Sequence, residues 1–277
     1  MPELPEVETI VRGLRPRLVG RTIKTIAVTH PLLLRDTGSS VLNSFAGKRV
    51  VGLRRRGKMI LLDCSGGLTL VFHLKMTGQL LFRRQDEPLD KHTHGVISFH
   101  SAGHGLRFRD IRKFGFILGV KTAELYRRGE LRRLGPEPLE LDFASFLSRL
   151  EGRRGRLKSL LLNQNMIAGI GNIYADEILF EARLHPLTQV ARLRRPKLLK
   201  LWAAVSVILR KAVFFRGTSV RDYRDGNGLE GSFQNHLRVY GREGLPCLSC
   251  GTPVRRLVLG GRSSFFCPRC QRKPRPH

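Results

Sequence analysis

Two pairs of cysteines near the C-terminal end have the spacing of a metal site. Cys247 and Cys250 form one Cys-x2-Cys pair, and after sixteen residues Cys267 and Cys270 form a second. Four thiolates in two such pairs predict a closed tetrahedral site for one structural zinc ion, because no coordination position stays open for a substrate. Four unrelated cysteines or an iron–sulfur centre are the alternatives. The fifth cysteine, Cys64, lies in an apolar segment and is expected in the core.

The N-terminus offers covalent chemistry. Pro2 follows Met1, and removal of Met1 would expose a secondary amine. Attack of such an amine on a sugar C1′ carbon gives a permanently cationic iminium, which is an electron sink for elimination. Glu3 could donate a proton, and a helix starting just behind Pro2 would disfavour the protonated amine. Taken alone, this start also fits a simple lead-in to a helix, and Lys58 could equally be a solvated strand charge.

Three turn-like segments could contact a ligand. Residues 73–78 and 112–115 place large side chains beside turn glycines, which fits protruding wedges or ordinary strand ends. Residues 169–172 precede a predicted helix, so glycine amides there could bind an anion while Asn172 caps the helix. The glycine spacing fits neither the dinucleotide fingerprint nor the phosphate-binding loop, so no nucleotide cofactor is expected.

The elements that must position these residues change character along the chain. Apolar side chains at Val7, Ile10, Val11, Leu14 and Leu18 predict a helix over residues 5–18. Short apolar or alternating runs then predict antiparallel strands. These runs are residues 22–29, 58–63, 68–74, 79–82, 95–99, 106–108 and 116–120.

A domain boundary is expected at residues 135–138, where two prolines cannot continue a helix. Beyond it, helices are predicted at residues 142–151, 156–163, 172–181 and 196–216. A glycine-rich charged loop follows at 217–231, and a β-hairpin is predicted between the cysteine pairs, with 257–259 and 264–266 flanking Gly260-Gly261. The fold class is therefore α+β.

The charge points to a polyanionic partner. The chain has 50 Lys+Arg against 22 Asp+Glu, a formal charge of +28, so nucleic acid is preferred over an anionic membrane surface. No run of eighteen apolar residues exists, and the N-terminus is acidic where a signal peptide is basic. A cytoplasmic protein without a membrane span is expected, and its clustered cysteines fit a reducing compartment.

A set of motifs in fixed order covers almost the whole chain. They are MPELPEVET, HLKMTG, RKFG, GPEPL, GIGNIYADE, GLEGSFQ, VYGREG and the four-cysteine finger. This set resembles the formamidopyrimidine-DNA glycosylase family, bacterial enzymes that remove oxidised purines from DNA. The resemblance implies a leading helix with an antiparallel β-sandwich over residues 1–134 and a helix-two-turn-helix domain over 135–232, with a lesion-capping loop at 217–231. A zinc finger and basic tail would occupy 233–277.

The same resemblance implies an activity. It is that of a bifunctional glycosylase and abasic-site lyase of base excision repair, acting on 8-oxoguanine and formamidopyrimidines in damaged double-stranded DNA. The enzyme would work as a cytoplasmic, nucleoid-associated monomer through a Schiff base and β,δ-elimination.

Roles are implied residue by residue. Pro2 would be the nucleophile, Glu3 the acid that assists sugar opening, and Lys58 the acid/base of β-elimination. Arg262 would assist δ-elimination, and because arginine keeps its proton we expect it to act by electrostatic stabilisation. The implied DNA-backbone contacts are His73, His92, Arg153, Lys158, Asn172 and Tyr240. The implied gap-filling trio is Met76, Arg112 and Phe114. The implied lesion-recognition positions are Glu6, Thr218, Ser219, Arg221 and Tyr223.

Departures from the family pattern are Lys75, Ile111 and the basic tail at 272–277. They leave the expected chemistry unchanged and affect only the phosphate contacts and the role of the tail. Two alternative functions stay open. An endonuclease VIII-like enzyme would act on oxidised pyrimidines, and a zinc-dependent DNA-binding protein would carry out no chemistry.

Overall fold

The computed structural model describes residues 1–35, 39–101, 103–127, 129–219, 223–226 and 228–273. The chain forms two compact units, each made from two stretches of sequence. The first unit contains Met1–Arg132 and Phe215–Gln234, and the second contains Arg133–Phe214 and the segment from Asn235 onward. By their contacts, the segment after residue 214 groups with the N-terminal unit and the finger groups with the helices.

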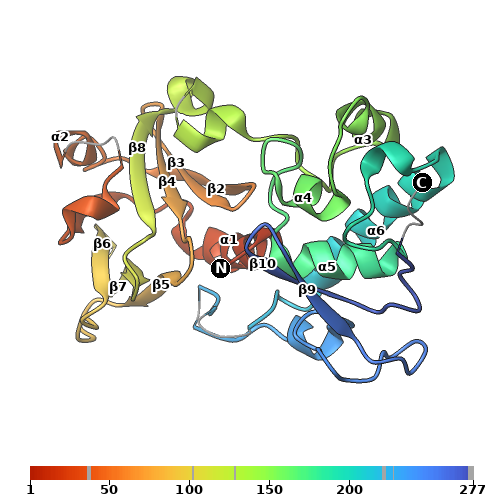
Figure 1. The fold of residues 1–277 in the computed structure, drawn as a ribbon. Coiled ribbons are helices and arrows are strands. Elements are labelled where there is room, and N and C mark those ends of the chain that lie inside the picture. The colour runs from red at the N-terminus through yellow and green to blue at the C-terminus, as the bar shows by residue number, and fades with distance from the viewer. Residues whose placement is uncertain (36–38, 102, 128, 220–222, 227, 274–277) are drawn as a thin grey trace. The chain divides into compact units, whose positions relative to one another are not determined.

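Two four-stranded antiparallel sheets and helix α1 (Leu4–Leu18) build the first unit (Figure 1). One sheet has the order β1-β6-β7-β5 and the other β2-β3-β4-β8. The strands are β1 (Ile23–Val28), β2 (Val50–Arg56), β3 (Met59–Cys64), β4 (Leu68–His73), β5 (Gly78–Arg84), β6 (Thr93–Phe99), β7 (His104–Asp110) and β8 (Phe116–Lys121). Short helical segments are η1 (Pro31–Leu33), α2 (Ser39–Asn43), η2 (Thr122–Arg127) and η3 (Gly129–Arg133).

Helix α1 forms where the apolar spacing predicts it. The five apolar side chains of its inner face are fully buried in the core that both sheets share. Arg15 and Arg17 lie in its last turn, where cations interact favourably with the helix dipole. The helix therefore anchors the N-terminal residues to the sheets.

Strand β2 is the strand that the sequence pattern did not predict. Its register places Arg54 opposite Leu61 and Arg55 opposite Ile60 of β3. A run of three arginines resembles a solvated segment, yet Arg54 Nε lies 2.7 Å from Asp63 Oδ2, and Arg55 Nε lies 3.0 Å from Glu8 Oε2. These ion pairs allow charged side chains within the sheet.

Four helices and one hairpin make up most of the second unit. They are α3 (Phe143–Leu150), α4 (Leu157–Leu162), α5 (Asn172–Glu181), α6 (Arg195–Phe214), β9 (Arg255–Leu259) and β10 (Arg262–Phe266), with short η4 (Val190–Arg192). The short helix η5 (Phe233–His236) includes the point where the chain passes from the first unit to the second. Gly260 and Gly261 form the hairpin turn with φ of 55° and 72°, which glycine adopts without strain. Strand β10 packs beside α5 (Figure 1). The expected helices and hairpin are thus confirmed.

Among the residues that the structure describes, no helix combines the length and the apolar character needed to cross a membrane.

Candidate functional site

The N-terminal residues lie at the start of α1. Glu3 is the N-cap residue, and its backbone amide donates to Glu6 Oε2 at 2.8 Å. Pro2 precedes this cap and is buried, whereas Met1 is 47% exposed. The nitrogen of Pro2 therefore stands at the positive end of a helix dipole, where a protonated amine is disfavoured.

Glu6 joins this N-terminus to the glycine-rich loop. Its second oxygen, Oε1, accepts a hydrogen bond from the backbone amide of Thr218 at 2.7 Å. Gly217 has φ +78°, and a Cβ atom there would lie 2.7 Å from Glu6 Oε1, so this approach requires glycine. The Tyr223 hydroxyl donates to the Glu6 carbonyl at 3.4 Å, and burial together with Glu6 raises the pKa of Tyr223.

The rest of the loop is organised locally. Ser219 receives a hydrogen bond from Gly231 and donates one to the Tyr223 carbonyl, at 3.0 and 3.1 Å. Arg221, also expected here, lies outside the described residues. The structure thus brings Glu6, Thr218, Ser219 and Tyr223 together in one unit.

Lys58 occupies the turn between β2 and β3, directly after Gly57, and is 7% exposed. His73, at the end of β4, is also buried, and its Nδ1 accepts the amide of Lys75 at 2.9 Å. Burial and the nearby charges of Lys75 and Lys58 lower the pKa of His73 to about 3, so its ring is neutral at physiological pH. Glu130 Oε1 accepts a hydrogen bond from the Lys75 ammonium at 2.9 Å.

All three expected gap-filling residues are exposed side chains of the first unit. Met76 is 41% exposed and Phe114 is 55% exposed. Arg112 is exposed, with its guanidinium carbon 4.7 Å from the centroid of the Phe114 ring. Such a cation–π contact keeps the two side chains together.

Asp110 is a buried carboxylate for which the sequence motifs predicted no role. It is fully buried at the end of β7. Oδ1 accepts the amide of Arg112 at 3.2 Å and the hydroxyl of Thr77, while Oδ2 accepts the amide of Gly115 at 2.7 Å. One side chain therefore holds both protruding segments. An aspartate at a strand end, just before a turn, was the signal available in the sequence.

The other expected contact of the first unit, His92, is hydrogen-bonded to Asp110. His92 is half-buried, and its carbonyl accepts the amide of Asp110 at 2.9 Å. The His92 amide donates to Asp90 at 2.6 Å.

In the second unit, the expected role of Asn172 as helix cap is wrong. Gly171 is the N-cap of α5, with extended backbone, and its carbonyl accepts the amide of Ala175 at 2.9 Å. Asn172 is the first helical residue, and its side-chain amide donates to the Ser263 carbonyl at 3.1 Å. Its Oδ1 is buried and has no hydrogen-bond partner among the described residues.

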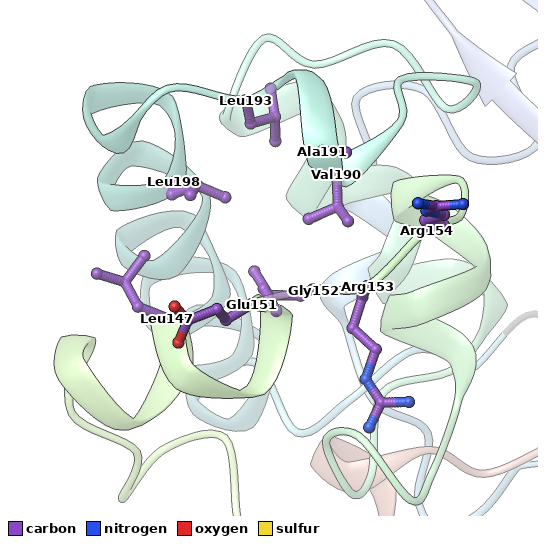
Figure 2. Close-up of a pocket in the computed structure, with 10 residues that line it drawn as sticks. Leu147, Glu151, Gly152, Arg153, Arg154, Val190, Ala191, Leu193 and Leu198 are labelled. Carbon is purple, nitrogen blue, oxygen red and sulfur yellow. The ribbon is translucent and has the colours of Figure 1, made fainter.

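Arg153 lies at the edge of an open pocket of about 560 Å³. Figure 2 shows Leu147, Val190 and Leu198 around this pocket, with the side chain of Arg153 extending away from them. Arg153 is exposed and able to reach a ligand.

Tyr240 is half-buried on the finger side of the second unit. Its amide donates to Glu177 Oε1 at 2.9 Å, and its ring meets Phe265 edge-on at 5.2 Å. Glu177 also accepts the amides of Arg238 and Val239, and burial raises its pKa.

Lys158 occupies an interior position. It is fully buried on α4, and its ammonium lies 2.7 Å from Asp176 Oδ1, which is also fully buried. This position argues against the expected direct contact with a DNA backbone, because the ammonium has no exposed surface.

The four C-terminal cysteines converge. Their sulfur atoms all lie within 4.8 Å of one another, with 3.4 Å between Cys250 and Cys267 and 4.0 Å between Cys247 and Cys270. Tetrahedral zinc with Zn–S bonds of about 2.3 Å separates its sulfurs by roughly 3.8 Å, so the geometry fits one structural zinc ion. Cys64 lies apart in β3, where burial raises its pKa to about 12, as expected for an inert core thiol.

Family models match in three places. The Formamidopyrimidine-DNA glycosylase N-terminal domain matches residues 1–117, and the H2TH domain of the same enzymes matches residues 134–224. A zinc finger found in FPG and IleRS matches residues 244–272.

Relatives match over nearly the full length. The formamidopyrimidine-DNA glycosylase of Desulforamulus reducens is 45% identical, with 98% of this chain and 99% of that protein covered. The protein of the same name from Solibacter usitatus is also 45% identical and is covered completely, together with 99% of this chain.

Solved structures agree with the fold. A Lactococcus lactis FPG variant bound to DNA containing Fapy-dG superposes with a TM-score of 0.92 at 34% identity, covering 98% of this chain and 100% of that one. The structure of MutM with DNA containing carbocyclic 8-oxo-G gives 0.90 at 35% identity over the same shares.

Proposed function

The chain belongs to the formamidopyrimidine-DNA glycosylase family, and from this premise we propose that it removes oxidised purines from duplex DNA and then cleaves the strand at the resulting site. The proposed substrates are 8-oxoguanine and formamidopyrimidines. Relatives in solved complexes carry DNA with these lesion types, which supports the choice. The chain would act as a monomer without a nucleotide cofactor.

The first step uses the N-terminus. After removal of Met1, the Pro2 amine attacks C1′ of the lesion nucleotide and the bond from C1′ to the base breaks. Glu3 donates a proton to the sugar ring oxygen, so that the ring opens and the iminium forms. The location of Pro2 before the first turn of α1 supports this role, because the helix dipole keeps the amine unprotonated and nucleophilic.

Two eliminations follow. The iminium acidifies the C2′ hydrogen, Lys58 takes that proton, and the C3′–O bond breaks with loss of the 3′ strand as a phosphate. Loss of the C4′ proton then breaks the C5′–O bond and releases the 5′ strand as a phosphate. Arg262 stabilises the departing phosphate electrostatically. No oxidant or reductant is consumed.

Access to the lesion requires its extrusion from the helix, which costs a few kcal/mol. Met76, Arg112 and Phe114 fill the gap, and their exposure and common support from Asp110 favour this role. The loop held by Glu6 at Thr218 covers the extruded base. The DNA backbone is held by exposed Arg153 together with His73, His92, Asn172 and Tyr240. The net charge of +28 supplies affinity for DNA that is independent of its sequence.

Zinc has a structural role in this proposal. Cys247, Cys250, Cys267 and Cys270 hold it, and it fixes the strands that carry Arg262. When bound, the ion supplies folding energy to the finger and takes no part in the bond changes.

The observation that carries the proposal is the placement of Pro2 at the N-terminal end of α1 with Glu3 as its cap. The experiment is borohydride trapping on duplex DNA containing 8-oxoguanine. We expect a covalent complex through the N-terminal peptide, and none when Met1 is retained. A crosslink on Lys58, or efficient base excision with Met1 still attached, would contradict the mechanism. Faster excision of thymine glycol than of 8-oxoguanine would contradict the proposed substrate class.

A further inference from the structure

Lys158 and Asp176 form a fully buried ion pair in the second unit. Both side chains are 0% exposed, and Lys158 Nζ lies 2.7 Å from Asp176 Oδ1. The same ammonium donates to the Ser263 carbonyl and to Ser264 Oγ, each at 2.8 Å. Three oxygens on two different elements therefore surround one ammonium. Such a set compensates for the desolvation of a buried charge.

Helices α4, which carries Lys158, and α5, which carries Asp176, both hold the same short stretch of β10. Asp176 Oδ2 accepts the backbone amide of Phe265 at 3.0 Å, and Asn172 donates to the Ser263 carbonyl at 3.1 Å. Residues 263–265 are thus bonded, one after another, to side chains of α4 and α5. Burial raises the pKa of Asp176 to about 7 against the opposing effect of Lys158, so the carboxylate depends on its partner to stay ionised.

Arg262 directly precedes this stretch. It is exposed, it is the first residue of β10, and it pairs with Leu259 across the Gly260-Gly261 turn. A turn of two glycines imposes little conformational restraint. Besides its pairing with β9, the Arg262 backbone is therefore held by the bonds at Ser263, Ser264 and Phe265. Two of the sulfur ligands, Cys247 and Cys250, precede the hairpin, and the other two, Cys267 and Cys270, follow it.

We propose that the Lys158–Asp176 pair is a positioning device for Arg262, which aligns its guanidinium for the second elimination. This inference rests on the proposed function, in which Arg262 stabilises the phosphate that leaves in that step. Lys158 and Asp176 act through the hairpin backbone and touch no substrate. The device adds to what zinc provides, because its hydrogen bonds hold residues 263–265 directly, whereas zinc holds the chain at the cysteines.

The test compares the products formed at an abasic site. The variant Lys158→Met/Asp176→Asn removes both charges together, so no unpaired ion stays buried. Ser264→Ala removes one acceptor of the ammonium. Ser263→Ala is the matched control, because it removes only a hydroxyl that accepts from Arg256 and leaves the carbonyl in place.

We expect the ratio of δ- to β-elimination product to fall roughly 10- to 100-fold in the double variant, the range of an ångström-scale misplacement. A smaller fall is expected for Ser264→Ala and none for Ser263→Ala. Borohydride trapping should keep the wild-type rate and the zinc content should stay at one ion. In an Arg262→Gln background, the double variant should cause no further loss, since Arg262 is the group it displaces.

Equal loss of trapping and of both eliminations would overturn the proposal, since it would show a general structural role. So would an additive loss in the Arg262→Gln background. Hydrogen exchange at the Phe265 amide provides a readout independent of activity, and protection there should fall in the double variant and persist in Ser263→Ala. Unchanged protection would contradict the positioning role. If the wild-type protein yields no δ product, the proposed function fails, and the exchange data alone decide whether the pair fixes the hairpin.

Discussion

The carboxylate of Asp110 accepts the backbone amide of Gly115 at 2.7 Å, which ties the end of β7 to the segment that carries Arg112 and Phe114. Through its other oxygen, Asp110 also holds Thr77, the residue after Met76. The protruding side chains of two separate turns therefore share one buried support.

Replacing this support should separate base extrusion from strand cleavage. We expect Asp110→Ala to slow excision of 8-oxoguanine about tenfold or more while cleavage of a preformed abasic site changes less, because an abasic nucleotide is easier to extrude. Loss of the Asp110 carboxylate leaves the amides of Arg112 and Gly115 without their acceptor, which costs about 1–3 kcal/mol of folding stability for each amide that stays buried. Single-turnover rates on both substrates provide the measurement, with Asp86→Ala as control, because exposed Asp86 pairs only with Arg84 in the described interactions. Equal slowing on both substrates would refute the idea.

Glu6 should couple the lesion loop to the N-terminus. Glu6→Gln keeps the size but leaves one acceptor oxygen for two amides, those of Glu3 and Thr218. We expect excision of 8-oxoguanine to fall roughly 10- to 100-fold, the kinetic equivalent of about 1–3 kcal/mol. Glu8→Gln, on the same helix but paired with Arg12 and Arg55, is the control and should change excision little. A wild-type rate in Glu6→Gln would show that the loop does not depend on this bridge.

Salt dependence should distinguish Arg153 from Lys158. Arg153 is exposed, so Arg153→Ala should reduce the slope of log K against log salt by about 0.9, the value for one phosphate contact. Lys158 is buried, so Lys158→Met should leave that slope unchanged even where affinity falls. DNA-binding titrations over a range of salt concentrations measure both. A reduced slope for Lys158→Met would place its ammonium on DNA after all.

Zinc removal should affect one unit more than the other. All four sulfur ligands lie in the second unit, and structural zinc sites contribute about 10–16 kcal/mol of apparent binding energy to folding. Cys250→Ser should therefore lose zinc and DNA affinity together, while the β-sheet signal in circular dichroism persists. Cys64→Ser, a change in a core strand, should retain the metal. Normal DNA affinity in zinc-free protein would disprove the prediction.

The buried imidazole of His73 predicts acid sensitivity of the first unit. Its pKa falls from 6.5 in the unfolded chain to about 3 in the folded chain, through burial and the positive charges of Lys75, Lys58 and Arg35, which Glu130 opposes in part. The stability it contributes is complete above pH 6.5 and is lost as the pH falls toward 3, because the unfolded chain binds the proton first.

The expected slope is about 1.4 kcal/mol per pH unit in that window. His73→Asn, which keeps an acceptor for the Lys75 amide, should remove this slope. Urea unfolding at pH values of about 5 to 7 measures it, with the exposed His100→Asn as control. The same acid slope in His73→Asn and wild type would assign the effect to other groups.

Much of the fold follows from patterns that are local in the sequence. Helix α1 and the finger hairpin follow from apolar periodicity and from paired glycines, and seven of the eight strands of the first unit from short apolar runs. Strand β2 was not predicted, because the charges of Arg54 and Arg55 are neutralised by Asp63 and Glu8, and no local pattern reveals these partners. The grouping into two compact units likewise depends on which distant segments pack together, and no local pattern contains that information.

The candidate site divides in the same way. Cysteine spacing was sufficient to locate the metal ligands, whose sulfurs converge as expected. The supporting acids Asp110, Asp176 and Glu177 were missed, because their importance comes from burial and from backbone amides that they meet only in the folded chain. For Lys158, a family motif predicted a residue at the surface, whereas the second unit encloses it. A motif reports that a residue type is present, and only packing decides where its charge lies.

The hydrogen bond between Glu6 and Thr218 joins residues 212 positions apart. A growing polypeptide therefore exposes its N-terminal helix long before the segment that completes it has been synthesised, and residues 133–214 must leave the ribosome in between. A prematurely terminated chain that ends among those helices contains Pro2, Glu3 and Lys58 without the loop. Translation thus supplies the reactive end of the molecule first and the segment that Glu6 holds over two hundred residues later.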